Sequence, residues 1–506
     1  MTAVLINPNL IVQRNDRFTT GVVYMPIGLA YVAASLRGAG IPVRVIDAFG
    51  EEPRQSRREG AFSVLGLTPA EVVERMPEAT SVAFVYANQL LNHASLASMV
   101  QAVKARYPQL PVVILENTQA VTAYQLLPIA DELFRCGADY LLSGEAELSA
   151  IETYRALQDP SREQARQVAG LSARTFRNPV RPFNTDLDSL PMPAWDLLPI
   201  ENYWSLHFAH GPLSSGRYLP LLTSRGCPYP CNFCVVPATN ALTWRARSAG
   251  NVVDEMEQLS SRFGVREFHI EDLNPTIQDR RTRQICQEIL QRKLKIVWKL
   301  VAGTKVETMR NEETIDLMAQ SGCRYISISP ESGSPRMLKL IDKPFKADHA
   351  VKLIKRMHQV GIRSQACFVL GFPDEQDADR EMTRNMVKEF TQVGVDEIAL
   401  FIIAPVPGSK IFGTMSGYTS LSELNFTPTW RADYALLNRF RLRLYLSFLL
   451  WKIRYHPLTV ARQCLNFLAR RFETKMEMVP YRALIFRLLD LRSKPGLPAP
   501  AGVSHA

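Results

Sequence analysis

The sequence predicts an α/β protein with two successive parallel-sheet domains and a helical C-terminal region. Short β-branched runs alternate with helical segments over residues 1–155, and a second alternation of the same kind covers residues 216–420. A chain of 506 residues is long enough for two or three domains. Its 46% apolar and 21% charged residues form a globular composition, which excludes a disordered or collagen-like chain.

The first domain is expected to be a doubly wound sheet. Its strands are predicted at Ala3–Ile6, Val43–Ile46, Ser81–Tyr86, Val112–Leu115 and Tyr140–Leu142. Pro26 begins a helical pattern that Gly38 and Gly40 close. Ligands bind such sheets outside the carboxyl ends of the strands. Those ends carry polar residues, namely Asn7–Asn9, Tyr86–Gln89, Glu116–Thr118 and Ser143–Glu145.

These residues alone leave the role of the first domain open. No Gly-rich dinucleotide fingerprint follows the first strand, so NAD and FAD are disfavoured. A ligand site at the strand ends is one interpretation. A docking or scaffolding domain is the other, and these residues alone favour it, because loops are polar in any case and a fold does not fix a function.

The net charge of +10 is confined to one region. Between Arg431 and Lys494 there are 14 basic and 4 acidic residues, and residues 1–430 hold 45 of each sign. A protein-wide basic surface for nucleic acid is therefore disfavoured. No apolar run approaches the ~20 residues that span a bilayer, and the N-terminus lacks the pattern of a signal peptide. A cytoplasmic protein is expected.

The strongest signal is a group of three cysteines. Of the eight cysteines, Cys227, Cys231 and Cys234 fall within eight residues, which suits a reduced compartment and a metal site. Their C-x3-C-x2-C spacing lies in a loop that Pro228 and Pro230 stiffen. Three thiolates on one loop can bind three irons of a four-iron cluster and leave the fourth iron open. A structural zinc site is the alternative, but neither a second C-x-x-C pair nor a nearby histidine completes it.

The triplet resembles that of the radical S-adenosylmethionine (SAM) enzymes, in which an aromatic residue precedes the last cysteine, as Phe233 does here. The resemblance implies that Cys227, Cys231 and Cys234 hold a [4Fe–4S] cluster. In that family the open iron chelates the amino and carboxylate groups of SAM, and one electron cleaves SAM to methionine and a 5′-deoxyadenosyl radical. The Phe233 backbone would lie against the adenine.

Six strands are expected in the second domain, and each ends in a polar loop. They are predicted at Tyr218–Thr223, Glu267–Ile270, Lys295–Leu300, Tyr325–Ser329, Ala366–Leu370 and Glu397–Ile403. This order predicts a partial (β/α)6 barrel with its site at the C-terminal face of the strands.

Several of these loops resemble the SAM-binding loops of the radical family. They include an E-S-G-S segment, a G-x-P-x-E turn and a P-G loop after successive strands, whereas Asn274 stands where Phe is commoner. Each loop alone is ordinary turn chemistry, and their order behind the triplet carries the resemblance. It implies SAM contacts from Phe233, Glu271, Glu331, Ser332, Gly371, Glu375 and Val406.

Isolated cysteines and histidines in the chain have two interpretations. Cys323 and Cys367 lie in predicted strands and are candidates for a radical-quenching or methyl-carrying thiol. A small, inert core residue is the preferred interpretation of both. His93 and His269 are likewise interpreted as core or surface residues.

The order of domains is similar to that of the cobalamin-binding radical SAM enzymes, many of which are class B methyltransferases. A linker over residues 156–215 joins the two sheets, and the Pro26–Ala30 and Gly144–Glu147 segments also resemble that family. The histidine motif D-x-H-x-x-G is absent, as is common there, and Glu116–Gln119 replaces a Gly-Gly-x-His turn. The resemblance implies cobalamin contacts from Asn9, Pro26, Gly28, Tyr86, Asn88, Gln89, Glu116, Asn117, Thr118, Gly144 and Glu145.

The function expected is a cobalamin-dependent radical SAM methyltransferase acting on an unactivated carbon or phosphorus of a small-molecule or lipid-like substrate. Its electron donor would be a protein such as flavodoxin or ferredoxin. The alternatives are a radical cyclase, rearrangement or oxidation enzyme that uses cobalamin differently, and a cobalamin- or lipid-binding module with a vestigial barrel. Methylthiotransferases of transfer RNA share the triplet, but they carry three more cluster cysteines in the first domain, where this chain has only Cys136.

The basic region, residues 421–494, is predicted to be helical. Helices are expected at Leu436–Tyr455, Leu458–Arg471 and Tyr481–Leu491. Such basic amphipathic helices either lie on anionic lipid or cap the open barrel, with the long Arg stems covering its rim. Capping is preferred over peripheral membrane contact. Residues 495–506 are expected to be disordered.

Overall fold

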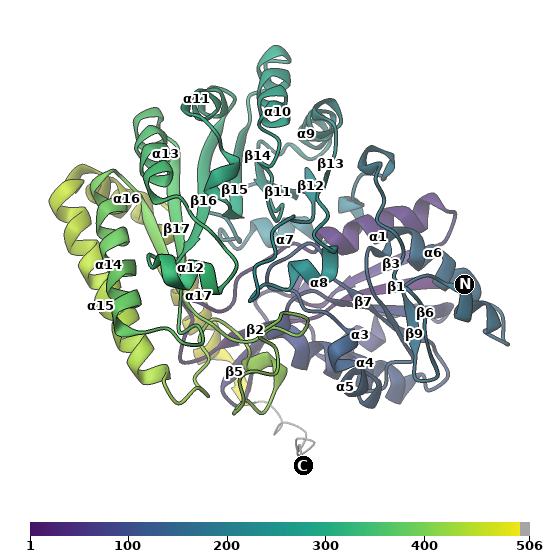
Figure 1. The fold of residues 1–506 in the computed structure, drawn as a ribbon. Helices are drawn as coiled ribbons and strands as arrows, with labels where there is room; N and C mark the ends of the chain where they lie inside the picture. Colours follow the sequence, from purple (N-terminus) through teal and green to yellow (C-terminus); the bar gives the residue numbers. More distant parts are fainter. Residues whose placement is uncertain (496–506) are drawn as a thin grey trace.

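The computed structural model of the chain describes residues 1–495 and contains two parallel sheets that lie side by side (Figure 1). The predicted α/β fold is confirmed. Apart from Pro495, the segment expected to be disordered lies outside the described residues.

The first domain is built on a seven-stranded sheet. Its order is β10 (Phe176–Arg177), β9 (Leu171–Ala173), β8 (Tyr140–Leu142), β7 (Val112–Glu116), β6 (Thr80–Ala87), β1 (Thr2–Asn7) and β3 (Val43–Asp47). All neighbours from β8 to β3 are parallel, whereas β9 and β10 are antiparallel additions. The order of the parallel strands reverses between β1 and β6, and ligands bind doubly wound sheets at such a switch point.

Six helices cover this sheet. They are α1 (Ile27–Gly38), α2 (Ala48–Glu51), α3 (Pro69–Glu74), α4 (His93–Arg106), α5 (Ala130–Arg135) and α6 (Ala146–Ala156). Thr68 and Glu71 form a capping box that fixes the start of α3. The strands are almost wholly buried, because helices pack on both faces of a doubly wound sheet.

A small second sheet on this domain escaped prediction. Its order is β19 (Lys494–Pro495), β4 (Ser56–Glu59), β5 (Phe62–Leu65) and β2 (Leu10–Gln13). The first of these strands comes from the C-terminal end of the described chain, so the C-terminal region is joined to the N-terminal domain by backbone hydrogen bonds.

The second domain is the expected partial barrel of six parallel strands. Its order is β11 (Tyr218–Leu221), β14 (Glu267–Ile270), β15 (Val297–Thr304), β16 (Cys323–Glu331), β17 (Arg363–Leu370) and β18 (Glu397–Ile402). The helices of this domain are α8 (Val236–Asn240), α9 (Ala249–Phe263), α10 (Asp279–Gln291), α11 (Glu312–Gln320), α12 (Pro335–Leu340), α13 (Ala347–Val360) and α14 (Asp377–Gln392). Ser248 caps the start of α9, and Gly264 ends it in the left-handed conformation.

Two further elements lie outside the large sheets. The linker contains α7 (Ile200–Trp204), and the hairpin of β12 (Ser224–Arg225) and β13 (Arg245–Ala246) stands between the first and second barrel strands. A continuous buried apolar cluster includes Leu5, Ile326 and Phe486, so the two domains and the C-terminal region share one core.

The C-terminal region forms three helices, as predicted: α15 (Tyr434–Tyr455), α16 (Pro457–Ala469) and α17 (Lys475–Arg492). The first two lie at the outer edge of the barrel beside α14 (Figure 1). The third begins six residues earlier than expected, because Pro480 lies inside the helix and does not end it. Asp490, near the end of α17, is held by Ser63 and by three arginines of the first domain.

Candidate active site

A cavity of about 890 Å³ lies where the two domains and the C-terminal helices meet. Its wall is formed by the cysteine loop, the carboxyl ends of strands from both sheets, and side chains of α15 and α17. This volume is near the upper end of the range for small-molecule sites. The strand ends of the first domain and the cysteine triplet, which are far apart in sequence, therefore face one space.

The cysteine loop follows β12 directly. Gly226 begins it with φ +80, and a Cβ there would lie 1.9 Å from the Thr243 carbonyl oxygen, so only glycine fits. Cys227, Cys231 and Cys234 all line the cavity and none forms a disulfide. The fold therefore presents the three thiols on one wall.

The chemistry of these donors fits an iron–sulfur cluster. Burial raises the pKa of all three thiols, that of Cys234 to about 12, while the amine of Lys343 acts in the opposite direction. Thiols of this kind become thiolates when a metal binds them. Within residues 1–495 no three His, Cys, Asp or Glu side chains are grouped to hold a single metal ion. Cluster ligands bind separate irons.

Two acids stand on the cavity wall beside the triplet, and each has a cationic or imidazole partner. Glu331 ends β16 in a left-handed backbone conformation, φ +65, and its carboxylate accepts from the buried Lys343. Glu271 pairs with Nδ1 of His210 at 2.7 Å. Tyr24 stacks on the His210 ring with centroids 4.4 Å apart. A strained backbone at Glu331, held by a buried ion pair, is typical of a functional site.

Four of the seven predicted SAM-binding residues line the cavity: Phe233, Glu271, Glu331 and Val406. The Phe233 ring packs edge-on against Phe372 of the G-x-P-x-E turn, with centroids 5.3 Å apart. The turn is thereby brought behind the cysteine loop.

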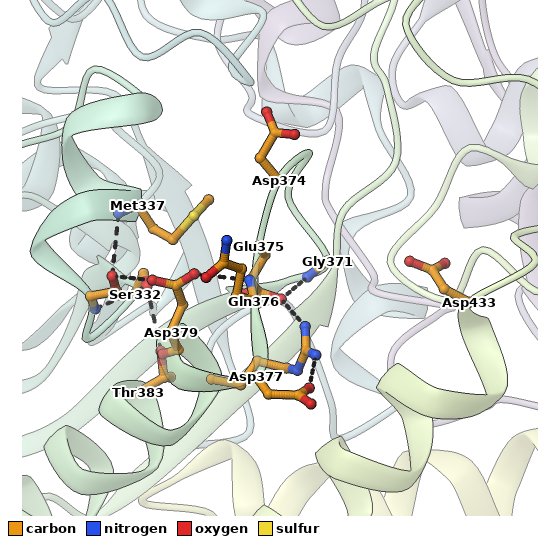
Figure 2. A network of polar contacts seen from close by, with 12 residues as sticks. Ser332, Met337, Gly371, Asp374, Glu375, Gln376, Asp377, Asp379, Thr383 and Asp433 are labelled. Carbon is orange, nitrogen blue, oxygen red and sulfur yellow. Dashed lines mark hydrogen bonds and ion pairs between the residues drawn. The ribbon is translucent and has the colours of Figure 1, made fainter.

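The other three, Ser332, Gly371 and Glu375, belong to a polar network behind the wall (Figure 2). Glu375 accepts from the Gly371 backbone at 2.8 Å and pairs with Arg380 at 3.2 Å. Ser332 Oγ accepts from the Ser334 backbone at 3.2 Å. In the structure these residues hold the two loops in place, and their contact with SAM stays a prediction.

The first domain contributes the opposite wall. Six of the predicted cobalamin-binding residues line the cavity: Pro26, Gly28, Tyr86, Asn88, Gln89 and Asn117. The Asn88 amide donates to Asn7 across the switch point at 2.8 Å. A Cβ on Gly28 would lie 2.2 Å from the Tyr86 hydroxyl, so α1 can approach β6 only with glycine there. A large cavity lined by amide side chains fits a corrinoid, which is a large ligand rich in amide groups.

The remaining five, Asn9, Glu116, Thr118, Gly144 and Glu145, do not line the cavity. Asn9 donates to the Leu67 carbonyl at 2.8 Å, and the Glu116 carboxylate accepts from the backbones of Leu126 and Gly144. Glu145 pairs with Arg245 of the barrel at 2.8 Å. These polar groups fix the loops and the domain contact, and their role in cobalamin binding stays a prediction.

The isolated cysteines and histidines divide between core and cavity. Cys323, His93 and His269 are buried outside the cavity, as the preferred interpretation holds. Cys367 lines the cavity, and its thiol lies 3.4 Å from the Ser327 hydroxyl. Burial raises the pKa of the Cys367 thiol to about 11.

Several cavity residues were missed from the sequence. His210 lies in the segment interpreted as a linker, and Lys343 has no motif that ties it to Glu331. The same holds for Lys475 and Arg482 of α17, because a helical pattern alone does not tell which face meets a ligand.

Comparisons with known proteins agree with this site. A family model described as the radical SAM superfamily matches residues 221–387. The chain is 29% identical over 297 residues to an uncharacterized methyltransferase of Pyrococcus horikoshii, covering 58% of this chain and 60% of that relative. It is 26% identical over 447 residues to the cytidylyl-2-hydroxyethylphosphonate methyltransferase of Streptomyces wedmorensis, covering 81% and 80% of the two chains.

Two solved structures have the same fold. The radical SAM methyltransferase TsrM of Kitasatospora setae, with cobalamin and a [4Fe–4S] cluster bound, superposes with a TM-score of 0.61 at 17% identity over 81% of this chain and 74% of its own. The cobalamin-dependent radical SAM enzyme OxsB gives 0.60 at 16% identity over 88% of this chain and 56% of its own. The barrel region of this chain, residues 221–387, therefore matches the radical SAM superfamily, and the chain shares its fold with these two radical SAM enzymes.

Proposed function

We propose that the protein is a cobalamin-dependent radical SAM methyltransferase that acts on a carbon or phosphorus of a small-molecule or lipid-like substrate. The observation that carries the proposal is the shared cavity, in which the cysteine triplet and the amide-rich wall of the first domain face each other. The relatives named above support methyl transfer, and a hopanoid C-3 methylase of Methylococcus capsulatus, 24% identical over 391 residues, adds a lipid methylase to them.

The residues on the two walls would hold three cofactors. Cys227, Cys231 and Cys234 would bind the cluster, and Glu271 and Glu331 would bind SAM beside it. Asn88 and Asn117 would hydrogen-bond the corrinoid amides. When bound, the cluster supplies single electrons, SAM supplies both the radical and the methyl group, and the corrinoid carries the methyl group.

The protein's own contribution is to position the reactants in one cavity. The Glu331–Lys343 pair fixes a carboxylate beside the cluster loop, and the His210–Glu271 pair fixes a second one. Side chains of helix α17 line the cavity together with the carboxyl ends of the barrel strands. Holding reactants in one geometry removes a large entropic part of the barrier.

One partner follows from this function. The cluster needs one electron for each SAM cleaved, and a reduced flavodoxin or ferredoxin is the donor expected.

No helix within residues 1–495 is long and apolar enough to cross a membrane. A cytoplasmic location is part of this proposal, and so is peripheral membrane contact through the basic region. Exposed leucines on α15 support the membrane contact.

The experiment that tests the function is anaerobic reconstitution with iron, sulfide and cobalamin, followed by reduction in the presence of SAM. The expected result is a four-iron absorbance, a corrinoid spectrum and reductive SAM cleavage. Replacing the triplet by alanines should abolish the absorbance and the cleavage and leave the corrinoid spectrum. A cluster and SAM cleavage without any retained corrinoid would favour a radical enzyme of another type. If no cluster forms, the alternative of a cobalamin- or lipid-binding module with a vestigial barrel would be favoured.

A further inference from the structure

Helix α17 places two cationic side chains without carboxylate partners on the cavity wall. Arg482 is 2% exposed, and its one hydrogen bond goes to the Phe18 carbonyl at 2.8 Å, leaving its buried Nε without a partner. Lys475 donates only to the Val301 carbonyl at 3.3 Å. Neither has an ion pair within 4.0 Å among the described residues. Both line the cavity.

The acids around these two cations are already engaged. Glu397 accepts from the Tyr325 hydroxyl and from the Met476 backbone, and Glu271 is paired with His210. Asp16 pairs with Arg441 at 3.2 Å. Glu397 and Glu271 therefore act on Lys475, and Asp16 on Arg482, only from a distance, and neither cation has a carboxylate in direct contact among the described residues.

Leaving a buried arginine and a half-buried lysine without a carboxylate in direct contact is costly. Burial lowers the pKa of Lys475, and it lowers the pKa of Arg482 to about 10. A buried charge without a partner destabilises a fold, whereas an anion between two cationic donors forms charge-assisted hydrogen bonds. Arg482 follows Lys475 by seven positions, about two helical turns, so both side chains project from one face of α17, about 10 Å apart along its axis.

We propose that Lys475 and Arg482 form a binding site for an anionic group of the substrate, a carboxylate or a phosphoryl group. The inference rests on the proposed function, whose substrate class it narrows to anionic molecules with an apolar body. The apolar body is indicated by the neighbouring wall, where Val301, Ile398, Phe401 and Met478 line the same cavity. The C-terminal region would thus bind the substrate as well as form part of the cavity wall.

The test measures binding of simple amphiphiles to the reconstituted holoenzyme by calorimetry. The probes are octyl phosphate and octanoate as anions and 1-octanol as the neutral control. The variants are Lys475→Gln, Arg482→Gln and the charge-conserving Arg482→Lys. The matched control is Arg487→Gln, which changes an exposed arginine of the same helix. Corrinoid content and the melting temperature are recorded for each variant.

At least one anion is expected to bind about tenfold or more tightly than 1-octanol, as charged hydrogen bonds predict. Each Gln variant should lose most of that preference and retain its corrinoid, whereas Arg482→Lys and Arg487→Gln should keep it. Equal affinity for the anions and octanol, or unchanged binding in both Gln variants, would overturn the proposal. So would loss of corrinoid in Arg482→Gln with anion binding intact, since the cations would then hold a phosphate of the cofactor.

The same experiment separates this inference from the proposed function. If the wild-type protein retains no corrinoid but binds the anions through Lys475 and Arg482, the methyltransferase proposal fails and the anion site stands. If corrinoid and SAM cleavage are present but the anions show no preference, the methyltransferase stands and the anion site fails.

Discussion

Arg225 and Glu147 form a buried ion pair of 2.6 Å between the barrel and the first domain, with side chains only 4% and 8% exposed. Arg225 ends the short strand that leads into the cysteine loop, and Glu147 lies in the first turn of α6. The guanidinium also stands over the Tyr31 ring at 5.1 Å. The cluster loop is thus anchored to the domain that forms the opposite wall of the cavity.

Replacing Arg225 by methionine is expected to destabilise the protein by about 3–5 kcal/mol, because Glu147 would stay buried without its counter-charge. Urea denaturation measures the loss. The matched control is Arg292→Met, which removes an arginine from exposed ion pairs with Asp254 and Glu257, where only a small change is expected. Equal effects of the two substitutions would mean that the domain contact contributes no more than a surface pair.

Glu331→Gln is expected to lower SAM cleavage by about two orders of magnitude while the iron content stays that of the wild type. The reason is that the substitution keeps the shape of the side chain but removes the carboxylate beside the cluster loop. Formation of 5′-deoxyadenosine after reduction measures the activity, and Glu313→Gln, on an exposed residue, is the control. If the Glu331→Gln variant cleaves SAM at the wild-type rate, the Glu331 carboxylate does not take part in SAM binding.

The stability contributed by Asp379 should depend on pH in the acid range only. Burial alone would raise the pKa of this carboxyl, but hydrogen bonds from Arg336 and Ser334 lower it to about 2. The unfolded chain takes up the proton near the ordinary value of 3.8, before the folded state does. The stabilisation is therefore fully present above about pH 5 and is lost progressively as pH falls toward 2.

Comparing the wild type with Asp379→Asn checks this pH dependence. The difference in free energy of unfolding should be constant from pH 5 to 7 and should shrink below pH 4. A difference that grows as the pH falls would show that the carboxyl is protonated in the folded state.

The exposed face of α15 is expected to bind anionic lipid. Leu446 and Leu450 are 59% and 58% exposed one turn apart, and the exposed Arg443 and Arg454 lie on the same helix. Leu446→Glu with Leu450→Glu should lower sedimentation with phosphatidylserine vesicles about tenfold or more, since burial of leucine drives such binding. Deleting the region would be a poorer test, because α17 also lines the cavity.

Two results decide that prediction. Binding of the wild type that weakens with salt and is lost in the double variant supports membrane contact. Equal sedimentation of both proteins would leave α15 as part of the barrel cap alone.

The sequence was sufficient to predict both large sheets, because their strands are short β-branched runs whose burial follows from their composition. It could not predict the small sheet, since Ser56–Glu59 is polar and becomes a strand only by pairing with Phe62–Leu65. The expected helix began at Tyr481, whereas α17 begins at Lys475 and continues through Pro480.

The residues of the candidate site could likewise be predicted only in part. The cysteine triplet, Glu271 and Glu331 were found because short motifs carry them. The partners of these acids, Lys343 and His210, come from other loops, and only the tertiary fold brings them to the cavity. Glu145 lies at a polar strand end and was predicted to contact cobalamin, but in the structure it pairs with Arg245.

The most direct test of the central claim is the cofactor content of the chain after anaerobic reconstitution with iron, sulfide and cobalamin and removal of unbound material. We expect four irons and one corrinoid per chain. The triple variant Cys227→Ala, Cys231→Ala and Cys234→Ala should lose the irons and keep the corrinoid. A protein that binds the cluster but retains no corrinoid under these conditions would contradict the central claim.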